Sequence, residues 1–474
     1  MAHDFGLKAG SRCAADRTEG NSGIAGGSVG RLDDGNFMSK IRILRFVAAL
    51  AIGVARLAAE FQIHDGDRVV FLGDSITEQR LYSTYIEAYA LTRFPDWNLS
   101  FRNVGWGGDT AWLRQRAHPD EGQLFKAEGG ELDRKVTDAV ARGLGRDVLP
   151  LKPTFVTIKF GMNDHSYQKF RPDIFRAYAR SQAELATVLG KNGARVAFLT
   201  PQPIEERRPD PDVDERNQSL RQFSDGLRDV AKKAGATFVD QFDPYLKLMM
   251  SARASDPKAF IGGGDAVHPG PSGQTLMAWA VLKGLGADPR VAKAEIDVAA
   301  KSARTEGCAV NQIQVTDGKI TFERKDASLP MPIDSRGESA LKLAPVLEQL
   351  SQLELKLTGL TAAAYDVSID GELVGRIEAS ALAKGWNYSN TGGPITRQAR
   401  QVLVGVFEKN EIYFNRWRNV QLHQFPGWAK GPETEARRND ELKRLDVAIS
   451  EAETRLNASR KPKTHRFELK PATP

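Results

Sequence analysis

The stretch VVFLGDSITEQ, residues 69–79, joins a short apolar run to a polar segment with helical character. The apolar run predicts a buried strand, and the tripeptide Gly-Asp-Ser ends it. Ser75 and Glu78 also fit the capping box, in which a serine and a glutamate three residues later satisfy backbone donors at a helix start. Ser75 is therefore either a helix cap or a nucleophile, and the rest of the sequence has to distinguish the two.

Outward from this stretch, apolar runs alternate with helical patterns as far as residue 286. The further predicted strands are 98–105, 154–161, 195–201 and 237–242, and the predicted helices are 83–94, 174–193, 218–235 and 270–286. This alternation is typical of a parallel sheet with helices on both faces. We therefore predict an α/β domain over residues 60–285.

The pattern changes after residue 286. Two alternating segments, 312–324 and 365–379, each contain an Asp-Gly turn, which is the strongest short-range signal for a β-hairpin. With the apolar run 353–360 between them, they predict a small antiparallel β-rich domain over residues 286–395. Residues 396–474 are predicted to be a helical C-terminal segment whose last charged helix runs into a basic tail with solvated charges.

The chain has 474 residues, which favours two or three domains. Its formal net charge of +6 is small for this length, and no long basic stripe interleaved with aromatics indicates a nucleic-acid partner. The two cysteines, Cys13 and Cys308, form no disulfide framework and no zinc motif. We expect no cofactor and no metal, and the sequence leaves the oligomeric state open.

The N-terminal residues combine a structureless segment with a secretory pattern. Residues 1–37 are rich in small and polar residues, and Met38 opens a basic segment followed by a short apolar one. These are the parts of a signal peptide. We predict that residues 1–37 are a misassigned extension, that 38–59 form a signal peptide, and that the protein is exported. The alternative is an amphipathic helix packed on the fold. No stretch has the length that stable insertion into a membrane requires.

Chemically distinctive residues follow each of the first three predicted strands. The blocks are GDSIT at 73–77, NVGWGGDT at 103–110 and GMND at 161–164, and a fourth block, DAVH at 265–268, precedes the last predicted helix. In an open parallel sheet, the carboxyl ends of the strands meet at one crevice. A serine, a glycine-rich loop, an asparagine, an aspartate and a histidine gathered there are the groups that acyl transfer needs.

These four blocks, in this order, resemble the SGNH (GDSL) hydrolase family over roughly residues 65–285. The resemblance implies a flavodoxin-like three-layer α/β/α fold and ester hydrolysis. It also implies a catalytic triad and an oxyanion hole. The residues it assigns to these roles are Ser75, Gly108, Asn163, Asp265 and His268.

The chemistry of the residues agrees with these roles. A serine hydroxyl needs a base to remove its proton, and His268 is that candidate base, oriented by Asp265. The oxyanion needs preorganised donors, for which the backbone N–H groups of Ser75 and Gly108 and the side-chain amide of Asn163 are the candidates. A helix start can also present the serine hydroxyl, so the capping and nucleophile interpretations are compatible.

Several alternatives stay open. Asn163 could be a turn residue, and Asp265 and His268 could be metal ligands, although no third ligand is evident. His165 is either a substrate contact or an exposed loop residue. The segment GGSVG at 26–30 matches the nucleophile motif of α/β-hydrolases, but it lacks the flanking strand and helix, and we reject it.

For the substrate, we predict acyl esters, and acetyl esters of carbohydrates in particular. Trp106 lies in the second block and Trp112 just after it, and both could stack on sugar rings; the loop GWNYSNTGG carries Trp386 and Tyr388. Core packing is the alternative for each aromatic residue. The alternative functions are a lysophospholipase or thioesterase on the same triad, and a catalytically silent glycan-binding protein. The expected partner is a small-molecule or polysaccharide ester.

Overall fold

A parallel sheet in the order β2-β1-β3-β4-β5 forms the centre of the N-terminal half of the molecule. The computed structural model describes residues 60–473, so the predicted leader 1–59 lies outside the described residues. The strands are β1 (Arg68–Gly73), β2 (Ser100–Asn103), β3 (Phe155–Lys159), β4 (Arg195–Leu199) and β5 (Thr237–Val239). All four neighbouring pairs are parallel, as predicted.

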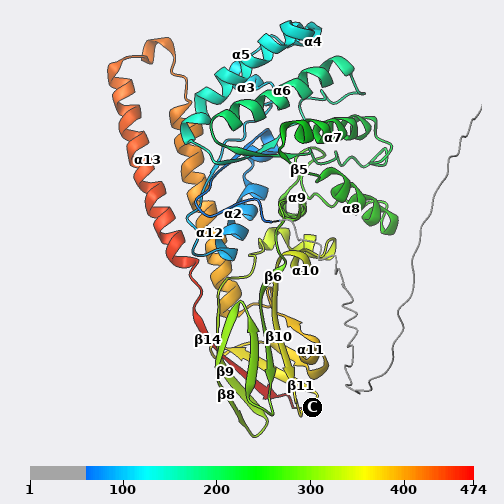
Figure 1. Ribbon diagram of the computed structural model, residues 1–474, viewed down its shortest axis with the longest axis vertical. Helices are drawn as coiled ribbons and strands as arrows, with labels where there is room; N and C mark the ends of the chain where they lie inside the picture. The colour runs from blue at the N-terminus through cyan, green and yellow to red at the C-terminus, as the bar shows by residue number, and fades with distance from the viewer. Residues whose placement is uncertain (1–59, 474) are drawn as a thin grey trace, which may run out of the picture. The chain divides into compact units, whose positions relative to one another are not determined.

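Helices cover both faces of this sheet (Figure 1). Along β1, Val70 and Leu72 join the core under α5 (Gly129–Asp147), α6 (Pro172–Lys191) and α7 (Glu215–Ala234). Val69 and Phe71 join the opposite core. That core contains α2 (Leu81–Arg93), α8 (Phe242–Ser255) and α9 (Pro271–Gly284). Because successive strand side chains point to opposite faces, an apolar run buries both faces at once. The predicted three-layer α/β fold is confirmed.

Three short helices complete the loops of this half. They are α1 (Ser75–Glu78), α3 (Arg114–Ala117) and α4 (Glu121–Lys126). None of the helices between residues 60 and 473 is long and apolar enough to cross a lipid bilayer.

Two further sheets follow the parallel one in the chain. The first has the order β13-β10-β6-β7 and the second has the order β12-β11-β14-β9-β8. The strands are β6 (Arg290–Asp297), β7 (Ser302–Glu306), β8 (Cys308–Thr316), β9 (Lys319–Asp326), β10 (Gln352–Thr358), β11 (Ala364–Ile369), β12 (Glu372–Glu378), β13 (Trp386–Asn387) and β14 (Thr464–Pro471). Both predicted hairpins form, and the Asp and Gly of each turn have positive φ, as such tight turns require.

Two predictions for this region are wrong. The run 353–360 does not lie between the hairpins in one antiparallel sheet, because β10 pairs in parallel with β6 in the other sheet. The C-terminal residues are not a basic tail, because β14 pairs antiparallel with both β9 and β11. Phe467 and Leu469 of β14 are fully buried. In this segment apolar residues alternate with charged ones, which is the pattern of a strand. The basic composition of the segment drew attention away from that pattern.

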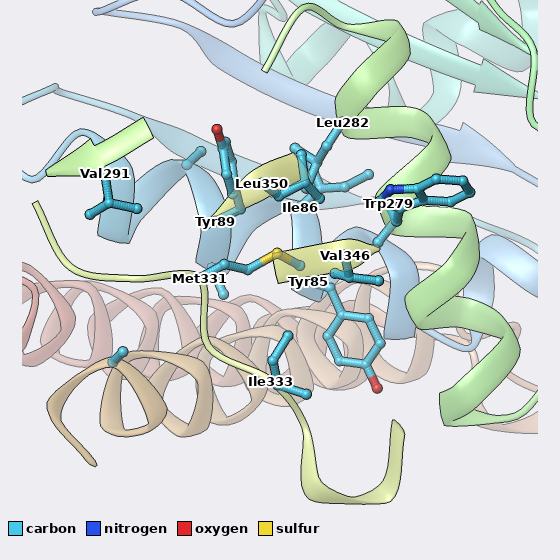
Figure 2. Close-up of a cluster of buried hydrophobic side chains, with 14 of the residues drawn as sticks. Tyr85, Ile86, Tyr89, Trp279, Leu282, Val291, Met331, Ile333, Val346 and Leu350 are labelled. Atoms are coloured by element: carbon cyan, nitrogen blue, oxygen red, sulfur yellow. The ribbon is translucent and has the colours of Figure 1, made fainter. Parts of the chain in front are cut away.

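Two long helices, α12 (Gly393–Phe414) and α13 (Pro432–Ser459), return from the β-rich part to the parallel sheet. In Figure 1, α12 runs beside α2, and α13 lies outside α12. The apolar core around α2 and α9 also continues into the β-rich part of the chain. Figure 2 shows α2 and α9 side chains gathered with Met331, Ile333, Val346 and Leu350, the last two from α10 (Val346–Leu350). The remaining short helix is α11 (Ala379–Lys384). The boundaries after residues 285 and 395 stay a prediction.

A buried ion pair joins α12 to α2. Lys409 Nζ lies 2.7 Å from Glu87 Oε1, and both side chains are almost fully buried. Lys409 also donates to Phe101 O at 3.2 Å, and Asn410 donates to Glu87 Oε2 at 3.0 Å. Burial raises the pKa of Glu87 and lowers the pKa of Lys409, so each charge depends on the other for compensation.

Replacing Lys409 with methionine should therefore lower the free energy of unfolding by about 3–5 kcal/mol, because Glu87 is left as an uncompensated buried charge. Urea denaturation measures this loss. Adding Glu87→Gln to Lys409→Met should restore much of it, since the double variant buries no charge at this position. A single-variant loss below about 1 kcal/mol, the range of an exposed pair, would contradict the buried role of this contact.

Candidate active site

The turn from β1 into α1 presents Ser75. Gly73 is required in this turn because a Cβ there would lie 2.2 Å from Thr77 Oγ1. Asp74 is the N-cap of the helix, and its Oδ1 accepts from the Ile76 N–H at 3.0 Å. Ser75 is thus the first residue inside the helix. The predicted capping box does not form, because Asp74 and not Ser75 caps the helix. Asp74 accepts from the backbone N–H of Ile76, which leaves the Ser75 hydroxyl for another partner.

That partner is a histidine from the other end of the domain. Ser75 Oγ lies 2.9 Å from His268 Nε2, and His268 Nδ1 lies 3.0 Å from Asp265 Oδ2. Asp265 Oδ1 also accepts from the backbone N–H groups of Val267 and His268. Partial burial acts to raise the pKa of Asp265, but these backbone donors and the His268 ring lower the pKa overall. The carboxylate therefore stays ionised and orients the imidazole.

Both ring nitrogens of His268 are thus engaged with Ser75 and Asp265. Among residues 60–473, no group of three or more His, Cys, Asp or Glu side chains is arranged to hold a metal ion.

Two polar residues after β4 hold the loop that carries Asp265 and His268. Gln202 Nε2 donates to Val267 O at 2.9 Å. Glu205 accepts from the N–H groups of Ile261 and Gly262 at 2.7 and 2.8 Å, and its own N–H donates to Ala266 O. Sequence reasoning missed both residues. The available signal was their position, directly after the predicted strand 195–201, at the same edge of the sheet as the other blocks.

The predicted oxyanion donors lie in neighbouring loops. Gly108 has φ +77°, a conformation that favours glycine. In the part of the chain that the structure describes, the backbone N–H groups of Ser75 and Gly108 donate no hydrogen bond. Asn163 Nδ2 donates to Asp109 O at 2.9 Å, which links the third block to the second and uses one of its two N–H bonds. Within the described residues, the second N–H bond of this amide donates to no other group.

Tyr167 is a further residue at the site that the sequence did not suggest. Its hydroxyl donates to Asn163 Oδ1 at 3.1 Å, and the residue is 42% exposed. The carbonyl of Asp109 can only accept, so it fixes Nδ2 on the side of the second block, and the Tyr167 hydroxyl contacts the opposite end of the amide. Nothing in the residue pattern around 167 marks this contact, which depends on the turn after the third block.

The two tryptophans predicted as substrate contacts belong to the core instead. Trp112 is fully buried, and its Nε1 donates to Glu121 Oε1 at 2.7 Å. Trp106 is 8% exposed and packs edge-on against Trp417. The Arg418 guanidinium covers the Trp106 ring at 3.9 Å from the ring centroid. Neither ring offers a free face on which a sugar could stack.

His165 is likewise neither exposed nor a substrate contact. It is 1% exposed, and its Nδ1 lies 3.2 Å from Gly161 O. Its ring packs against Tyr167 and Phe223. Burial lowers the pKa of His165 to about 4, so the side chain is neutral near pH 7.

A buried lysine lies behind the nucleophile turn. Lys159, the last residue of β3, is fully buried, and its Nζ is 3.8 Å from Asp74 Oδ1. Burial lowers the pKa of Lys159 and raises the pKa of the nearby Asp164 to about 7. Asp164 accepts from the N–H groups of Gly161 and Ala111, and so joins the second and third blocks. A lysine inside an otherwise apolar predicted strand was the available signal for this cluster.

Comparison with known proteins identifies the family of the domain that carries the candidate site. Residues 71–276 match the model of the GDSL-like lipase/acylhydrolase family. The chain therefore contains a domain of this family, and the protein is an acyl ester hydrolase. A comparison with curated proteins found no match.

The solved structures that resemble the chain are distant in sequence. BT4096, a gut microbial diltiazem-metabolizing enzyme, is 23% identical with a TM-score of 0.70, and the match covers 88% of this chain and 100% of that chain. The fold similarity therefore extends beyond residues 71–276. The acetylxylan esterase Axe2 from Geobacillus stearothermophilus is 20% identical over 48% of this chain and 97% of its own, with a TM-score of 0.37. LAE5, an alpha/beta hydrolase enzyme from the metagenome of Lake Arreo, is 22% identical over 48% of this chain and 98% of its own, with a TM-score of 0.36.

Replacing Asn163 with alanine should lower kcat by a factor on the order of 10²–10³ and change KM much less, because its second N–H bond matters most when negative charge develops. Asn163→Asp should be worse, since it brings a negative charge to the same place. Steady-state kinetics on a chromogenic ester measure both. Tyr167→Phe is the matched control: it removes the bond to Asn163 Oδ1 but keeps the amide, and should cost only a few-fold. Retention of more than about a third of kcat by Asn163→Ala would refute the role of the amide.

His165 should make the fold less stable in acid. Its pKa in the folded protein is about 4, against 6.5 in an unfolded chain. Between these pH values the unfolded chain binds a proton that the folded protein does not, so stability falls as the pH falls. The full difference corresponds to roughly 3 kcal/mol. Urea denaturation at pH 7 and pH 4.5 should show a loss that is larger in the wild type than in His165→Asn by roughly 2 to 3 kcal/mol. Equal losses would show that His165 does not contribute.

Proposed function

We propose that the protein hydrolyses short acyl esters through a triad of Ser75, His268 and Asp265. The observation that carries the proposal is the unbroken chain from Ser75 Oγ to His268 Nε2 at 2.9 Å and from His268 Nδ1 to Asp265 Oδ2 at 3.0 Å. Both distances lie in the hydrogen-bond range, so His268 Nε2 can take the proton of Ser75 while Asp265 holds the ring in place.

The reaction follows from this geometry. Ser75 Oγ attacks the acyl carbon while His268 Nε2 takes the hydroxyl proton, and Asp265 stabilises the imidazolium that forms. The oxyanion accepts from the backbone N–H groups of Ser75 and Gly108 and from Asn163 Nδ2. Collapse of the intermediate breaks the ester bond, and His268 returns the proton to the leaving alcohol. Water activated by His268 then hydrolyses the acyl-enzyme and regenerates Ser75.

For the alcohol portion, we propose a polar group such as a carbohydrate. The side chains of His268 and Asp265 are 36% and 68% exposed, so a bulky polar substrate can approach the triad. A cavity of about 680 Å³ adjoins the His268 loop and is lined by Glu206, Arg207, Arg208 and Phe260 among others. Charged groups beside one aromatic ring suit a polar ligand. The predicted export signal at 38–59 would bring such an enzyme to extracellular polymers. The buried Trp106 and Trp112 no longer support this proposal.

A lysophospholipase or long-chain thioesterase is less well supported. Such substrates need an apolar surface beside the nucleophile. In the described part of the chain, the exposed large hydrophobic residues are Tyr167, Val213, Leu373, Val404, Trp428 and Val447. Of these, Tyr167 lies at the candidate site, and its hydroxyl donates to Asn163 Oδ1. A silent glycan-binding protein would not need the intact triad.

A hydrolysis panel with a matched variant tests the proposal. The wild type should cleave acetylated xylo-oligosaccharides and acetylated monosaccharides faster than long-chain acyl esters. Ser75→Ala should lose at least about 10³-fold in kcat with an unchanged melting temperature, because no other group replaces the nucleophile. A serine-directed organophosphonate should label Ser75, as peptide mass spectrometry can establish. Wild-type turnover that persists in Ser75→Ala would refute the mechanism, and preference for long-chain esters would refute the substrate class.

A further inference from the structure

The C-terminal helices reach the loop that carries Gly108. After α12 the chain makes a π-helical turn, Asn415–Gln421. From this turn, Arg418 Nε contacts Glu78 Oε1 at 3.3 Å. The other oxygen of the same carboxylate, Glu78 Oε2, accepts from the Gly107 N–H at 2.7 Å. A single carboxylate thus connects a C-terminal arginine to the residue before the candidate oxyanion donor.

Arg418 also contacts the side chain of Trp106, the residue before Gly107. The Arg418 guanidinium lies 3.9 Å from the centroid of the Trp106 ring, within the range of a cation–π contact. Arg116 and Arg146 lie farther from that ring, at 5.3 and 5.1 Å. Arg116 is engaged with Asp109 and Asp147, and Arg146 donates to Arg116 O. Of the three arginines near the Trp106 ring, Arg418 is the one that also forms an ion pair with Glu78.

The loop needs such external support because its own backbone is permissive. Gly107 and Gly108 are adjacent and lack Cβ atoms, and Gly108 adopts φ +77°. A Cβ at Gly107 would lie 2.8 Å from Glu78 Oε2, so the close approach of the carboxylate depends on the glycine. The bond from the Asp109 N–H to Trp106 O at 3.0 Å closes this turn, but two glycines in sequence restrict the backbone little, so contacts from outside the turn help to orient the Gly108 N–H. An oxyanion donor, however, must be fixed to within a few tenths of an ångström.

We propose that Arg418 is a positioning residue for the oxyanion hole: through Glu78 and Trp106 it holds the Trp106-Gly107 peptide, which directly precedes the peptide that carries the Gly108 N–H. Arg418 lies outside the family domain at residues 71–276, so the C-terminal extension completes the catalytic site. The inference rests on the proposed function, since it needs Gly108 to bind the oxyanion. Arg418 touches no reacting atom, and its effect is on the rate of the chemical step.

Arg418→Gln tests the proposal, with Arg416→Gln as the matched control. Arg416 lies on the same π-helical turn but pairs with Asp446 and Gln421, within the C-terminal segment. We expect Arg418→Gln to lower kcat by about ten- to a hundredfold with KM within about twofold, as misplacement of a catalytic group does. The rate of organophosphonate labelling at Ser75 should fall in parallel. Arg416→Gln should change both rates by less than about twofold, the range of a surface substitution.

A double-variant cycle with Glu78→Gln separates this path from a general loss of stability. If Arg418 acts through Glu78, the double variant should be no slower than the slower single variant. Should Arg418→Gln fail to fold, Arg418→Met keeps the side-chain stem over Trp106, removes the charge, and is expected to give the same loss in kcat.

The experiment can refute either the proposed function or the role of Arg418 alone. Absence of wild-type labelling at Ser75 would refute the proposed function itself. Normal wild-type turnover and labelling, with Arg418→Gln or Arg418→Met matching Arg416→Gln in kcat, would refute only the role of Arg418.

Discussion

Parallel pairing of β1 with both β2 and β3 is the constraint on which the rest of the site depends. Phe71 is in register with Asn103, and Gly73 is in register with Lys159. The residues that follow these strands therefore leave the sheet at one edge, within reach of one another. The bond from Asn163 Nδ2 to Asp109 O becomes possible because the second and third loops leave the same edge of the sheet, from β2 and β3, the two strands on either side of β1. The serine follows the strand between them, so its hydroxyl and backbone N–H face the same space.

Buried polar groups then fix these loops more firmly than apolar contacts would. Asp164 takes N–H bonds from both Ala111 and Gly161, and Asp109 forms a buried ion pair with Arg116. Such groups are costly to bury, and removing one partner leaves the other uncompensated. Their contribution is directional: hydrogen bonds set the orientation of a peptide, whereas apolar packing mainly sets its distance. Preorganised donors of this kind are what acyl transfer requires, because they need no rearrangement when charge develops.

The C-terminal half packs directly against the hydrolase domain and belongs to the same structural unit. The core under α2 and α9 runs on into residues 329–350 (Figure 2), and α12 packs along α2 with the buried pair of Lys409 and Glu87. The last strand, β14, lies between β9 and β11, so the end of the chain completes a sheet whose first strand, β8, begins at Cys308. Such non-local pairing ties the extension to the hydrolase domain, and it explains how an arginine at position 418 comes to lie against a loop at position 107.

The sequence by itself determined the α/β fold, the four blocks of the site and the two Asp-Gly hairpins. Each of these has a local signature: the period of apolar residues, a fixed short motif, or a turn that only certain residues adopt. The tertiary structure alone decided which residues surround the blocks. Trp106 and Trp112 look like exposed binding residues next to a loop, yet distant segments bury them, because burial depends on what folds over a residue. The roles of Lys159 and Glu205 were hidden for the same reason, since their partners lie far away in the chain. The contact of Tyr167 with Asn163 is local, but it depends on the turn after the third block. Partners far apart in the chain have no spacing rule, so contacts such as Arg418 with Glu78 exist only once the strands and helices have packed.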